Sequence, residues 1–544
     1  MKRTIAFVLG ASLAFSAAAQ TWQDALLFSE NNYSGTARGV GMGNALTAIG
    51  GDAGSLVFNP AGSATASYSQ FAITPGVTFS ITNTFPSADN SDAYHGQRVS
   101  NTYARMKLPN VGFVLNMNTG RRSGLKRMTF GLVVNSTNNF TGRFKTAGVN
   151  GDNSYAASLA SSADGFAQSV MASEDWYYSS DRSRMPAWVD MTGYRSGMFN
   201  GVAGRDGAYV ALTEIIDEEG NFRLAAPVSQ QYGQQSYGTK TDALINFAMN
   251  FSDKLYVGAN VGLTALRYSL SEFWSEAPEN VADFPIIRYS DGTTAQFESL
   301  RMNRKYQLTG NGIYLKVGAL WRPVAGLRLA AAVQTPTLLN LTERYGYSGE
   351  TRLTGKFTGS ASSPEDEWIY ALRAPFRFNV GAAYTLGGVA VVSADYEFVN
   401  YAHSRFRSRT SDFEYGSGNF AGVNQDIQDI LGPSHELRAG AEFKLTPLFS
   451  LRAGYNLTTG GQRRYTQLRH AASLGIGHSF GGFFIDAAVR ARFAPEEYII
   501  PYNYYYAPDA SQFYNKVVDE SIITPENVIR STCIDALITL GWRF

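Results

Sequence analysis

The chain has 544 residues, and its 46 lysines and arginines nearly balance its 45 aspartates and glutamates. This balance removes the electrostatic basis for binding nucleic acid. The single cysteine, Cys533, excludes an internal disulfide framework and a cysteine-built metal site. Aromatic residues make up 13% of the chain and 54 residues are glycine, a composition typical of many short strands and turns.

The first residues have the features of a secretory signal peptide. Lys2 and Arg3 precede an apolar run, and Ala17–Ala19 form an A-x-A cleavage site. The alternative is a retained membrane helix, but the run has roughly ten apolar residues where about twenty are needed to cross a bilayer. We therefore expect residues 1–19 to be removed and the mature chain to begin at Gln20.

An irregular segment, residues 20–67, precedes the first expected strand. It is rich in glycine and alanine, which allow a backbone to bend tightly and to lie close to a neighbouring surface. Asn59-Pro60 is typical of a fixed turn. The segment is either a disordered tail or a compact unit that packs against the rest of the chain.

Alternation of apolar and polar residues then continues to the last residue. In the final segment the even-numbered positions from Ile534 to Phe544 are apolar, and most odd positions are polar or small, which predicts a strand with one apolar face. Segments of this kind are expected at 69–82, 109–118, 127–140, 241–251, 255–268, 311–321, 327–340, 375–386, 389–400, 435–445, 449–458, 470–480, 483–494 and 531–543.

The connections between these segments alternate between short and long. Short turns such as Ser252–Lys254 and Thr446–Leu448 would lie at one rim, and long loops such as 141–240 at the other, an asymmetry typical of an outer-membrane β-barrel. A large soluble β protein is the alternative. It is disfavoured because the segments match the roughly nine to eleven residues needed to cross a bilayer and keep one face largely free of charge. The sequence therefore predicts an all-β, 14-stranded antiparallel transmembrane barrel, 68–544.

A ring of this size leaves a lumen that something must fill. The small-residue segment starts on the side of the tight turns, so it is well placed to fold inward as a hatch. Its sequence from Ala37 to Gly62 resembles the N-terminal hatch of the FadL/TodX family of outer-membrane transporters of hydrophobic compounds. The matching residues are Ala37, Arg38, Gly39, Ala45, Asp52, Ser55, Asn59, Pro60, Ala61 and Gly62.

The resemblance implies a fourteen-stranded barrel plugged by the hatch, in the bacterial outer membrane. It implies passive uptake of hydrophobic compounds such as long-chain fatty acids or aromatic hydrocarbons, captured by external loops and passed through the plugged barrel. The terminal aromatic residue, Phe544, resembles the signal read by the barrel-assembly machinery. The expected surroundings are outer-membrane lipid and lipopolysaccharide.

The longest expected loop, 141–240, contains an aromatic cluster with Trp176, Tyr177 and Trp188. One interpretation is a groove that captures hydrophobic ligand, or a cap over the mouth of the barrel. The other is a loop that packs its own small core. Because the family pattern does not extend to this insertion, no external binding residue is transferred to it.

Four arginines are expected to face the lumen by alternation: Arg377, Arg438, Arg452 and Arg490. Each carries paired N–H donors that suit a carboxylate head group. Acidic residues share the same face, however, and cross-strand charge pairs are the ordinary filling of a polar barrel interior. Both interpretations stay open at the level of sequence.

The sequence offers no catalytic or cofactor motif. The five histidines show no paired ligand spacing, and the glycines from Gly39 to Gly43 follow no strand that would make a nucleotide loop. No enzyme activity, cofactor or metal is expected. The competing function of a different class is a protein-binding barrel that serves as shuttle or scaffold subunit of a secretion system and holds a secreted protein with its long loops. A general porin is disfavoured by the hatch.

Overall fold

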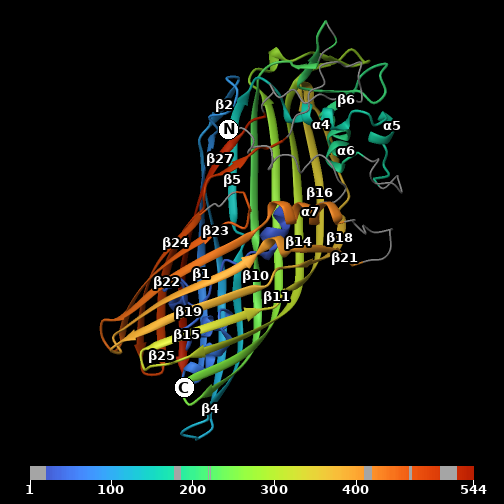
Figure 1. Cartoon of the computed structure of the whole chain (residues 1–544). Coiled ribbons are helices and arrows are strands. Elements are labelled where there is room, and N and C mark those ends of the chain that lie inside the picture. The colour runs from blue at the N-terminus through green and yellow to red at the C-terminus, as the bar shows by residue number, and fades with distance from the viewer. Residues whose placement is uncertain are drawn as a thin grey trace.

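The structure is a computed structural model that describes residues 20–176, 186–218, 220, 222–409, 420–464, 468–502 and 524–544. The expected signal peptide, 1–19, lies outside the described residues. Most of the described chain is strand, arranged as one tall wall around a narrow interior (Figure 1). None of the described helices is long and apolar enough to cross a bilayer.

The wall is an antiparallel ladder that closes on itself, because β27 (Asn527–Arg543) pairs with β1 (Gln70–Pro86). Several wall strands are divided in two, as β15 (Leu327–Gln334) and β16 (Leu338–Leu353) are, and both parts pair with β14. With each divided strand taken as one, the described residues form fourteen wall strands, which confirms the predicted fold class. The other wall strands are β3 (Val99–Asn118), β4 (Leu125–Asn139) with β5 (Gly142–Asn150), β10 (Val228–Phe251), β11 (Leu255–Pro278), β14 (Phe297–Trp321), β18 (Asp366–Arg373) with β19 (Arg377–Leu386), β20 (Ala390–Asn400) with β21 (Arg405–Ser408), β22 (Pro433–Lys444), β23 (Phe449–Thr459), β24 (Leu468–Phe480) and β25 (Phe483–Phe493).

Alternation places the apolar side chains on the outside of the ring. In β27, Ile538 and Trp542 are half exposed while Asp535 and Thr539 are buried inside. In β24, Leu474 is 68% exposed, although it is a leucine in a regular strand. A belt of such residues runs around the wall, which is the surface that lipid requires and water disfavours.

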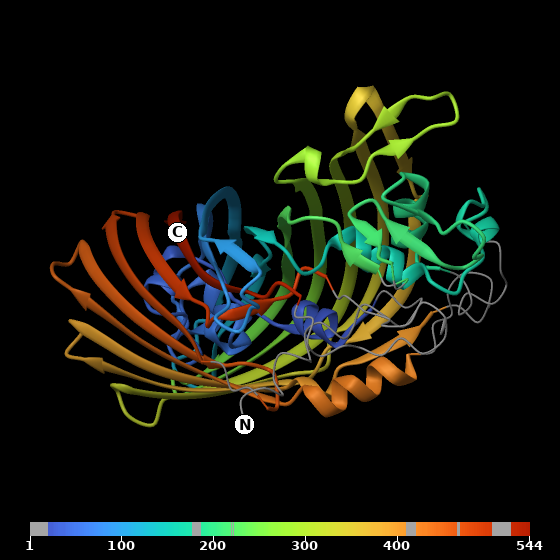
Figure 2. The same ribbon diagram turned by 90° about the horizontal axis from the view of Figure 1, so that it is seen from above.

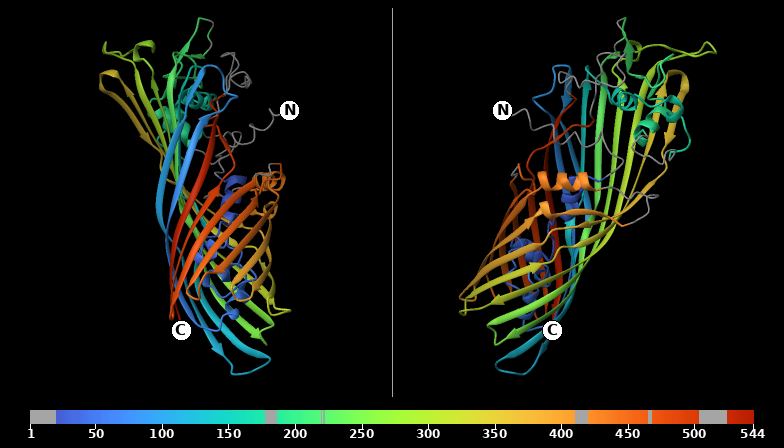
Figure 3. Two further views of the ribbon diagram at one scale, coloured as in Figure 1. Left: turned by 90° about the vertical axis from the view of Figure 1, so that its left-hand side faces the viewer. Right: turned by 45° about the vertical axis from the view of Figure 1, so that its right-hand side comes forward.

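The two sides of the barrel differ in height. β10, β11 and β14 have 24, 24 and 25 residues, whereas β22 to β25 have 11 to 13. Figure 3 shows the tall side rising well beyond the short side, where helix α7 (Ala421–Ile430) lies across the rim. The opposite rim carries tight turns, among them Ser252 and Asp253 with φ of 56° and 55°.

The tall strands correct several sequence-based boundaries. β10 begins at Val228 where 241 was expected, and β14 begins at Phe297 where 311 was expected. These upper parts extend past the apolar belt, so no lipid imposes an apolar outer face on them and the periodic signal disappears. The expected loop 141–240 is therefore shorter, because β5 and the upper part of β10 belong to the wall.

The N-terminal segment lies inside the ring, as the blue ribbon in Figures 1 and 2 shows. It forms helix α2 (Trp22–Ser29), helix α3 (Ala37–Gly41) and the 3-10 helices η2 (Ala53–Val57) and η3 (Pro60–Thr65). Nearly every residue from 33 to 64 is buried. The segment expected to act as a hatch is thus a packed part of the interior and not a tail.

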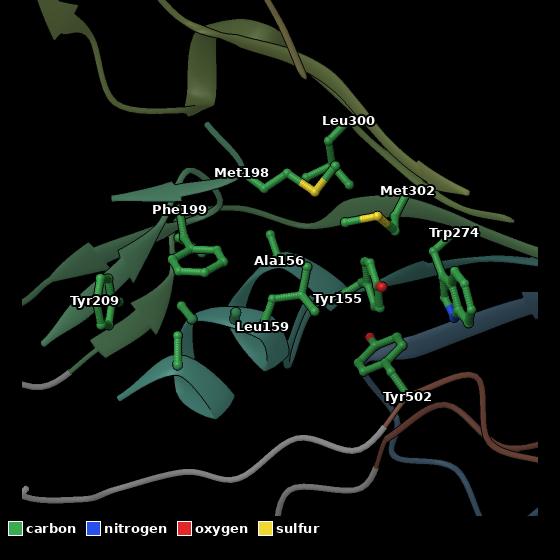
Figure 4. Packing of buried hydrophobic residues seen from close by; sticks show 14 of the residues in the cluster. Tyr155, Ala156, Leu159, Met198, Phe199, Tyr209, Trp274, Leu300, Met302 and Tyr502 are labelled. Carbon is green, nitrogen blue, oxygen red and sulfur yellow. The ribbon is translucent and has the colours of Figure 1, made fainter. Parts of the chain in front are cut away.

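A layer of small elements, here called the outer layer, packs on the inward-facing side chains of the upper parts of β10, β11 and β14. Helix α4 (Tyr155–Ala163) packs there with Phe199, Trp274 and Met302 in a closed aromatic and methionine-containing core (Figure 4). The other small elements are α5 (Gln168–Met171), α6 (Trp188–Arg195), η5 (Val281–Asp283), η6 (Thr354–Lys356), η7 (Tyr401–His403), β2 (Tyr94–Gln97), β6 (Phe199–Gly201), β7 (Tyr209–Ala211), β8 (Glu214–Ile216), β9 (Phe222–Leu224), β12 (Ile287–Arg288), β13 (Thr294–Ala295), β17 (Phe357–Ser362) and β26 (Glu497–Ile499).

Candidate functional site

The hatch, the 20–67 segment, is shaped by polar residues that cap its short helices. Thr36 Oγ1 accepts a hydrogen bond from the Gly39 nitrogen at 3.2 Å and donates to Asp52 Oδ1 at 2.7 Å. The same Asp52 oxygen accepts from the Gly54 nitrogen at 2.8 Å. Capping satisfies backbone donors that a helix start leaves free. Asp52 thus ties α3 to η2, which explains its place in the hatch motif.

Asn59 both caps η3 and bonds two backbone carbonyls. Its Oδ1 accepts from the Ala61 nitrogen at 3.0 Å, which caps η3 ahead of Pro60. Its Nδ2 donates to the Thr47 carbonyl at 3.0 Å and to the Ala319 carbonyl of β14 at 3.2 Å. One side chain therefore fixes the local fold of the hatch and attaches it to the wall.

Glycines bring the hatch backbone into contact with the wall. Gly43 has a φ of +61°, and a Cβ on it would lie 2.9 Å from the Ala439 carbonyl oxygen. On the wall side, a Cβ on Gly454 would lie 2.0 Å from the Gly43 nitrogen. A residue larger than glycine at Gly43 or Gly454 would force the two backbones apart. At this level the hatch meets β22 and β23 directly.

Arg38 of the hatch joins a chain of buried charges. Its Nε lies 2.9 Å from Glu442 Oε2, which also accepts from Arg452 Nε at 2.7 Å. Arg452 Nη1 continues to Asp486 Oδ1 at 2.6 Å. Burial of Glu442 is compensated by two guanidinium groups, one from the hatch and one from the wall. Removal of either partner would leave a buried charge.

Arg377 and Arg438 form a second buried cluster. Each lies within 2.8 Å of Glu397, and Arg438 also bonds Glu436 at 2.6 Å. Arg377 Nη2 donates in addition to the Ser29 carbonyl of the hatch. Both arginines face the interior as alternation predicts, and both are already bonded to carboxylates of the wall.

Arg490 belongs to a third cluster, centred on Asp535. Its Nη2 lies 2.9 Å from Asp535 Oδ2, and Lys107 Nζ lies 2.5 Å from Asp535 Oδ1. Arg490 Nη1 donates to the carbonyl of Tyr33 in the hatch at 2.7 Å. Arg377 and Arg490 thus each bond a carboxylate of the wall and a carbonyl of the hatch. A role for any of the four arginines in binding a ligand stays a prediction.

Helix α2, at one end of the hatch, is surrounded by a collar of aromatic and aliphatic side chains. Phe28 meets Phe140 and Tyr268 at ring distances of 6.3 and 5.7 Å. This collar was missed by sequence reasoning, because most of its members lie in the upper strands that were taken as loop or carried no periodic signal. Its buried residues are Trp22, Ala25, Leu26, Phe28, Phe140, Leu266, Tyr268, Tyr306, Leu308, Leu339, Leu341, Trp368, Tyr370, Leu372, Val399, Tyr401, Phe406, Phe420, Ile427 and Leu431.

Two carboxylates lie within the collar, on α2 and on β16. Asp24 accepts from the Thr21 nitrogen and hydroxyl, both at 2.9 Å. Burial raises the pKa of the Asp24 carboxyl, and these two bonds oppose the rise. Glu343 is fully buried and its Oε2 accepts from the hydroxyls of Tyr306 and Tyr370. The collar is apolar with a few fixed polar groups, as small-molecule sites are.

The wall is broken next to the collar. β3 pairs with β4 only from Asn118 to Asn110, and among the described residues its upper part has a ladder partner on the β1 side alone. β5 instead pairs with β10 and β2, while Thr82 of β1 donates to the Arg143 carbonyl. The division between β4 and β5 falls at Phe140, a collar residue. A gap in the hydrogen-bonded wall therefore adjoins the aromatic interior.

Two of the loop aromatics expected as a capture groove, Trp176 and Trp188, pack against each other. Trp188 Nε1 donates to the Trp176 carbonyl at 3.2 Å, and the two rings lie 5.8 Å apart. Trp176 is 8% exposed and belongs to the core of the outer layer. Tyr177 lies outside the described residues. This arrangement favours the interpretation of a loop with its own core, and a ligand role for the three residues stays a prediction.

One small pocket opens in the outer layer near the top of the lumen. Its walls include Tyr155, Tyr232, Trp274, Glu276 and Tyr502. Tyr155 stacks on Trp274 at 5.3 Å, and burial raises the pKa of the Tyr155 phenol well above its usual value. In the part of the chain that the structure describes, no group of three or more His, Cys, Asp or Glu side chains could hold a metal ion.

No family model matches the chain, and no curated protein matches it. Among solved structures, the Ralstonia pickettii toluene transporter TbuX is 13% identical, with 95% of this chain and 100% of that chain covered and a TM-score of 0.46. A Pseudomonas aeruginosa FadL homologue is 12% identical, with 94% and 98% covered and a TM-score of 0.48. The P. putida toluene transporter TodX is 13% identical, with 93% and 98% covered and a TM-score of 0.46. All three are remote matches.

Proposed function

We propose that this chain is an outer-membrane channel of the FadL/TodX type that takes up hydrophobic compounds passively. The observation that supports this most is the aromatic collar around helix α2 of the packed hatch, placed beside a break in the wall at Phe140. A polar porin would keep a water-filled bore. Here the hatch fills the bore, and apolar rings surround its helix α2.

The proposed route has three steps. A hydrophobic solute enters from the tall outer side, settles against the collar around α2, and leaves after a movement of the hatch. The lower end of the break, beside the exposed Met106 and Leu108 of β3, gives a lateral way out of the wall toward lipid, which suits a solute that prefers lipid to water. Only the concentration gradient is needed to drive this movement.

The charges of the interior support an uncharged solute more than a fatty-acid anion. Each of the four lumen arginines already bonds a carboxylate at 2.6 to 2.9 Å. The collar itself carries Asp24 and Glu343. An incoming carboxylate would meet these acidic groups and would have to displace existing partners from the arginines. Loss of these ion pairs would be more unfavourable than the new contact is favourable.

Uptake into cells tests this proposal. The chain is expressed in a Gram-negative host that lacks its own hydrophobic-compound channels, and entry of labelled toluene, palmitate and glucose is compared with that of the empty host. We expect faster entry of toluene, a smaller effect on palmitate and none on glucose. Equal entry of all three would indicate a general porin. No effect on any solute, with a secreted polypeptide that co-purifies, would favour the shuttle or scaffold role.

A further inference from the structure

Gln20, the first residue expected after signal cleavage, lies deep inside the barrel. It is 4% exposed, and its Nε2 donates to Glu343 Oε2 at 3.1 Å. Thr21 and Asp24 form a reciprocal capping box that begins α2 immediately afterwards. Residue 20 is therefore held at a defined place beside Glu343 and is not a free end.

The two carboxylate oxygens of Glu343 differ in their hydrogen bonds to the described part of the chain. Its Oε2 receives hydrogen bonds from Gln20 Nε2, from the Tyr306 hydroxyl at 3.1 Å and from the Tyr370 hydroxyl at 2.7 Å. Among the residues that the structure describes, its Oε1 is buried without a hydrogen-bond partner, as is the Oε1 of Gln20. A buried carboxylate oxygen that accepts no hydrogen bond destabilises the folded protein. Buried polar groups in native proteins normally have a hydrogen-bond partner.

The nearby charges leave Glu343 short of a cation. Asp24 lies close enough to repel it electrostatically. Arg304 attracts it, but its Nη1 is bonded to Glu272 Oε2 at 3.2 Å. Around Glu343 the collar is formed by rings such as Tyr370, which offer hydroxyls and no positive charge. A further ammonium group at this point would balance the buried acidic pair.

We propose that signal cleavage supplies this cation: the α-ammonium of Gln20 in the mature chain binds Glu343 Oε1 and fastens the hatch inside the barrel. Hydrolysis of the Ala19–Gln20 peptide bond consumes one water, leaves a carboxylate on Ala19 and leaves an amine on Gln20, which takes up a proton. Before cleavage this nitrogen is an uncharged amide with a single hydrogen. After cleavage it forms a charge-assisted hydrogen bond in a site of low polarity.

The proposal requires an open-chain glutamine. Cyclisation of an N-terminal glutamine joins its nitrogen to its own Cδ and releases ammonia. The product lacks both the ammonium and the Nε2 that donates to Glu343. Burial inside the collar holds the side-chain amide against Glu343 and away from that reaction. The inference is independent of which solute the barrel carries.

Labelling of the terminal amine tests the ion pair. The purified mature protein in detergent is treated with the N-hydroxysuccinimide ester of acetate at neutral pH, and modification of the N-terminal peptide is followed by mass spectrometry. We expect the terminal amine of Glu343→Gln to be labelled about tenfold faster or more than that of the unaltered protein. The loss of one charge-assisted hydrogen bond corresponds to a change of this size. The control is Glu367→Gln, whose carboxylate is 42% exposed and pairs with Arg344 on the outside. It should label at the rate of the unaltered protein.

Equal labelling of all three proteins would overturn the proposal, as would a mature terminus other than Gln20 or a terminal peptide that has lost one ammonia. A second measurement needs no variant. In an experimental structure of the mature protein, the Gln20 nitrogen should lie within about 3.2 Å of Glu343 Oε1. A separation beyond about 4 Å, the outer limit of an ion pair, would contradict the proposal even if Glu343→Gln failed to fold.

Discussion

The residues of the hatch motif act as caps and anchors. Asp52 and Asn59 each start a 3-10 helix, and Asn59 also bonds the wall. Arg38 reaches Glu442 across the interior. Their types could be read from the sequence, because caps act within three residues of chain. Their wall partners could not, because those depend on the register of strands about 260 to 400 residues away.

Glu442 is expected to stabilise the closed barrel through its two arginine partners. In Glu442→Gln the side chain keeps its size and loses its charge, so that Arg38 loses its carboxylate partner and Arg452 keeps Asp486 alone. We expect the free energy of unfolding to fall by on the order of 3 kcal/mol. The measurement is urea unfolding in lipid vesicles followed by tryptophan fluorescence.

The matched control for this change is Glu350→Gln. Glu350 pairs with Arg352 at 2.7 Å, but both side chains are more than 40% exposed. Removal of this exposed pair should cost less than about 1 kcal/mol. Equal losses in the two variants would show that the buried ion cluster does not stabilise the hatch.

Strands were predicted well where lipid faces them and poorly elsewhere. All fourteen expected segments lie on wall strands, since an apolar outer face and a polar inner face impose a period of two. The upper part of β10, Val228–Lys240, lacks this alternation of apolar and polar residues, so the sequence predicts a loop there. Helix α2 was not expected either, because only eight residues form it and its apolar residues are enclosed by the collar on several sides.

The break beside β3 makes a prediction about its backbone. Above Asn110, β3 has a ladder on the β1 side only, so among the described residues alternate amides from Val99 to Leu108 have no ladder partner on the other side. We expect these amides to exchange with deuterium faster than those of Asn110–Asn118. Residue-resolved hydrogen exchange in detergent measures this. Uniform protection along β3 would indicate a continuous wall and would remove the lateral exit.

The whole molecule combines a lipid-sized belt with a taller outer side. Leu474, 68% exposed on the short side, lies within the belt. Leu474→Arg should therefore hinder membrane assembly by roughly 2–4 kcal/mol. Ile216→Arg, at a residue 45% exposed in the outer layer, should have an effect within about 0.5 kcal/mol. Folded and unfolded fractions on semi-native gels after refolding into vesicles give both values, and equal effects would contradict the position of the belt.

The central claim is that solute passes only when the hatch moves, and a reversible link between hatch and wall tests it directly. Ser63 Oγ lies 2.7 Å from Thr129 Oγ1 of β4, so the pair Ser63→Cys with Thr129→Cys can be joined in a Cys533→Ser background. The control joins Ser154 and Thr213, whose hydroxyls lie 2.6 Å apart in the outer layer. In proteoliposomes, oxidation of the first pair should abolish toluene uptake and reduction should restore it, while the control transports in both states. Unchanged uptake with the hatch locked to the wall would contradict the account.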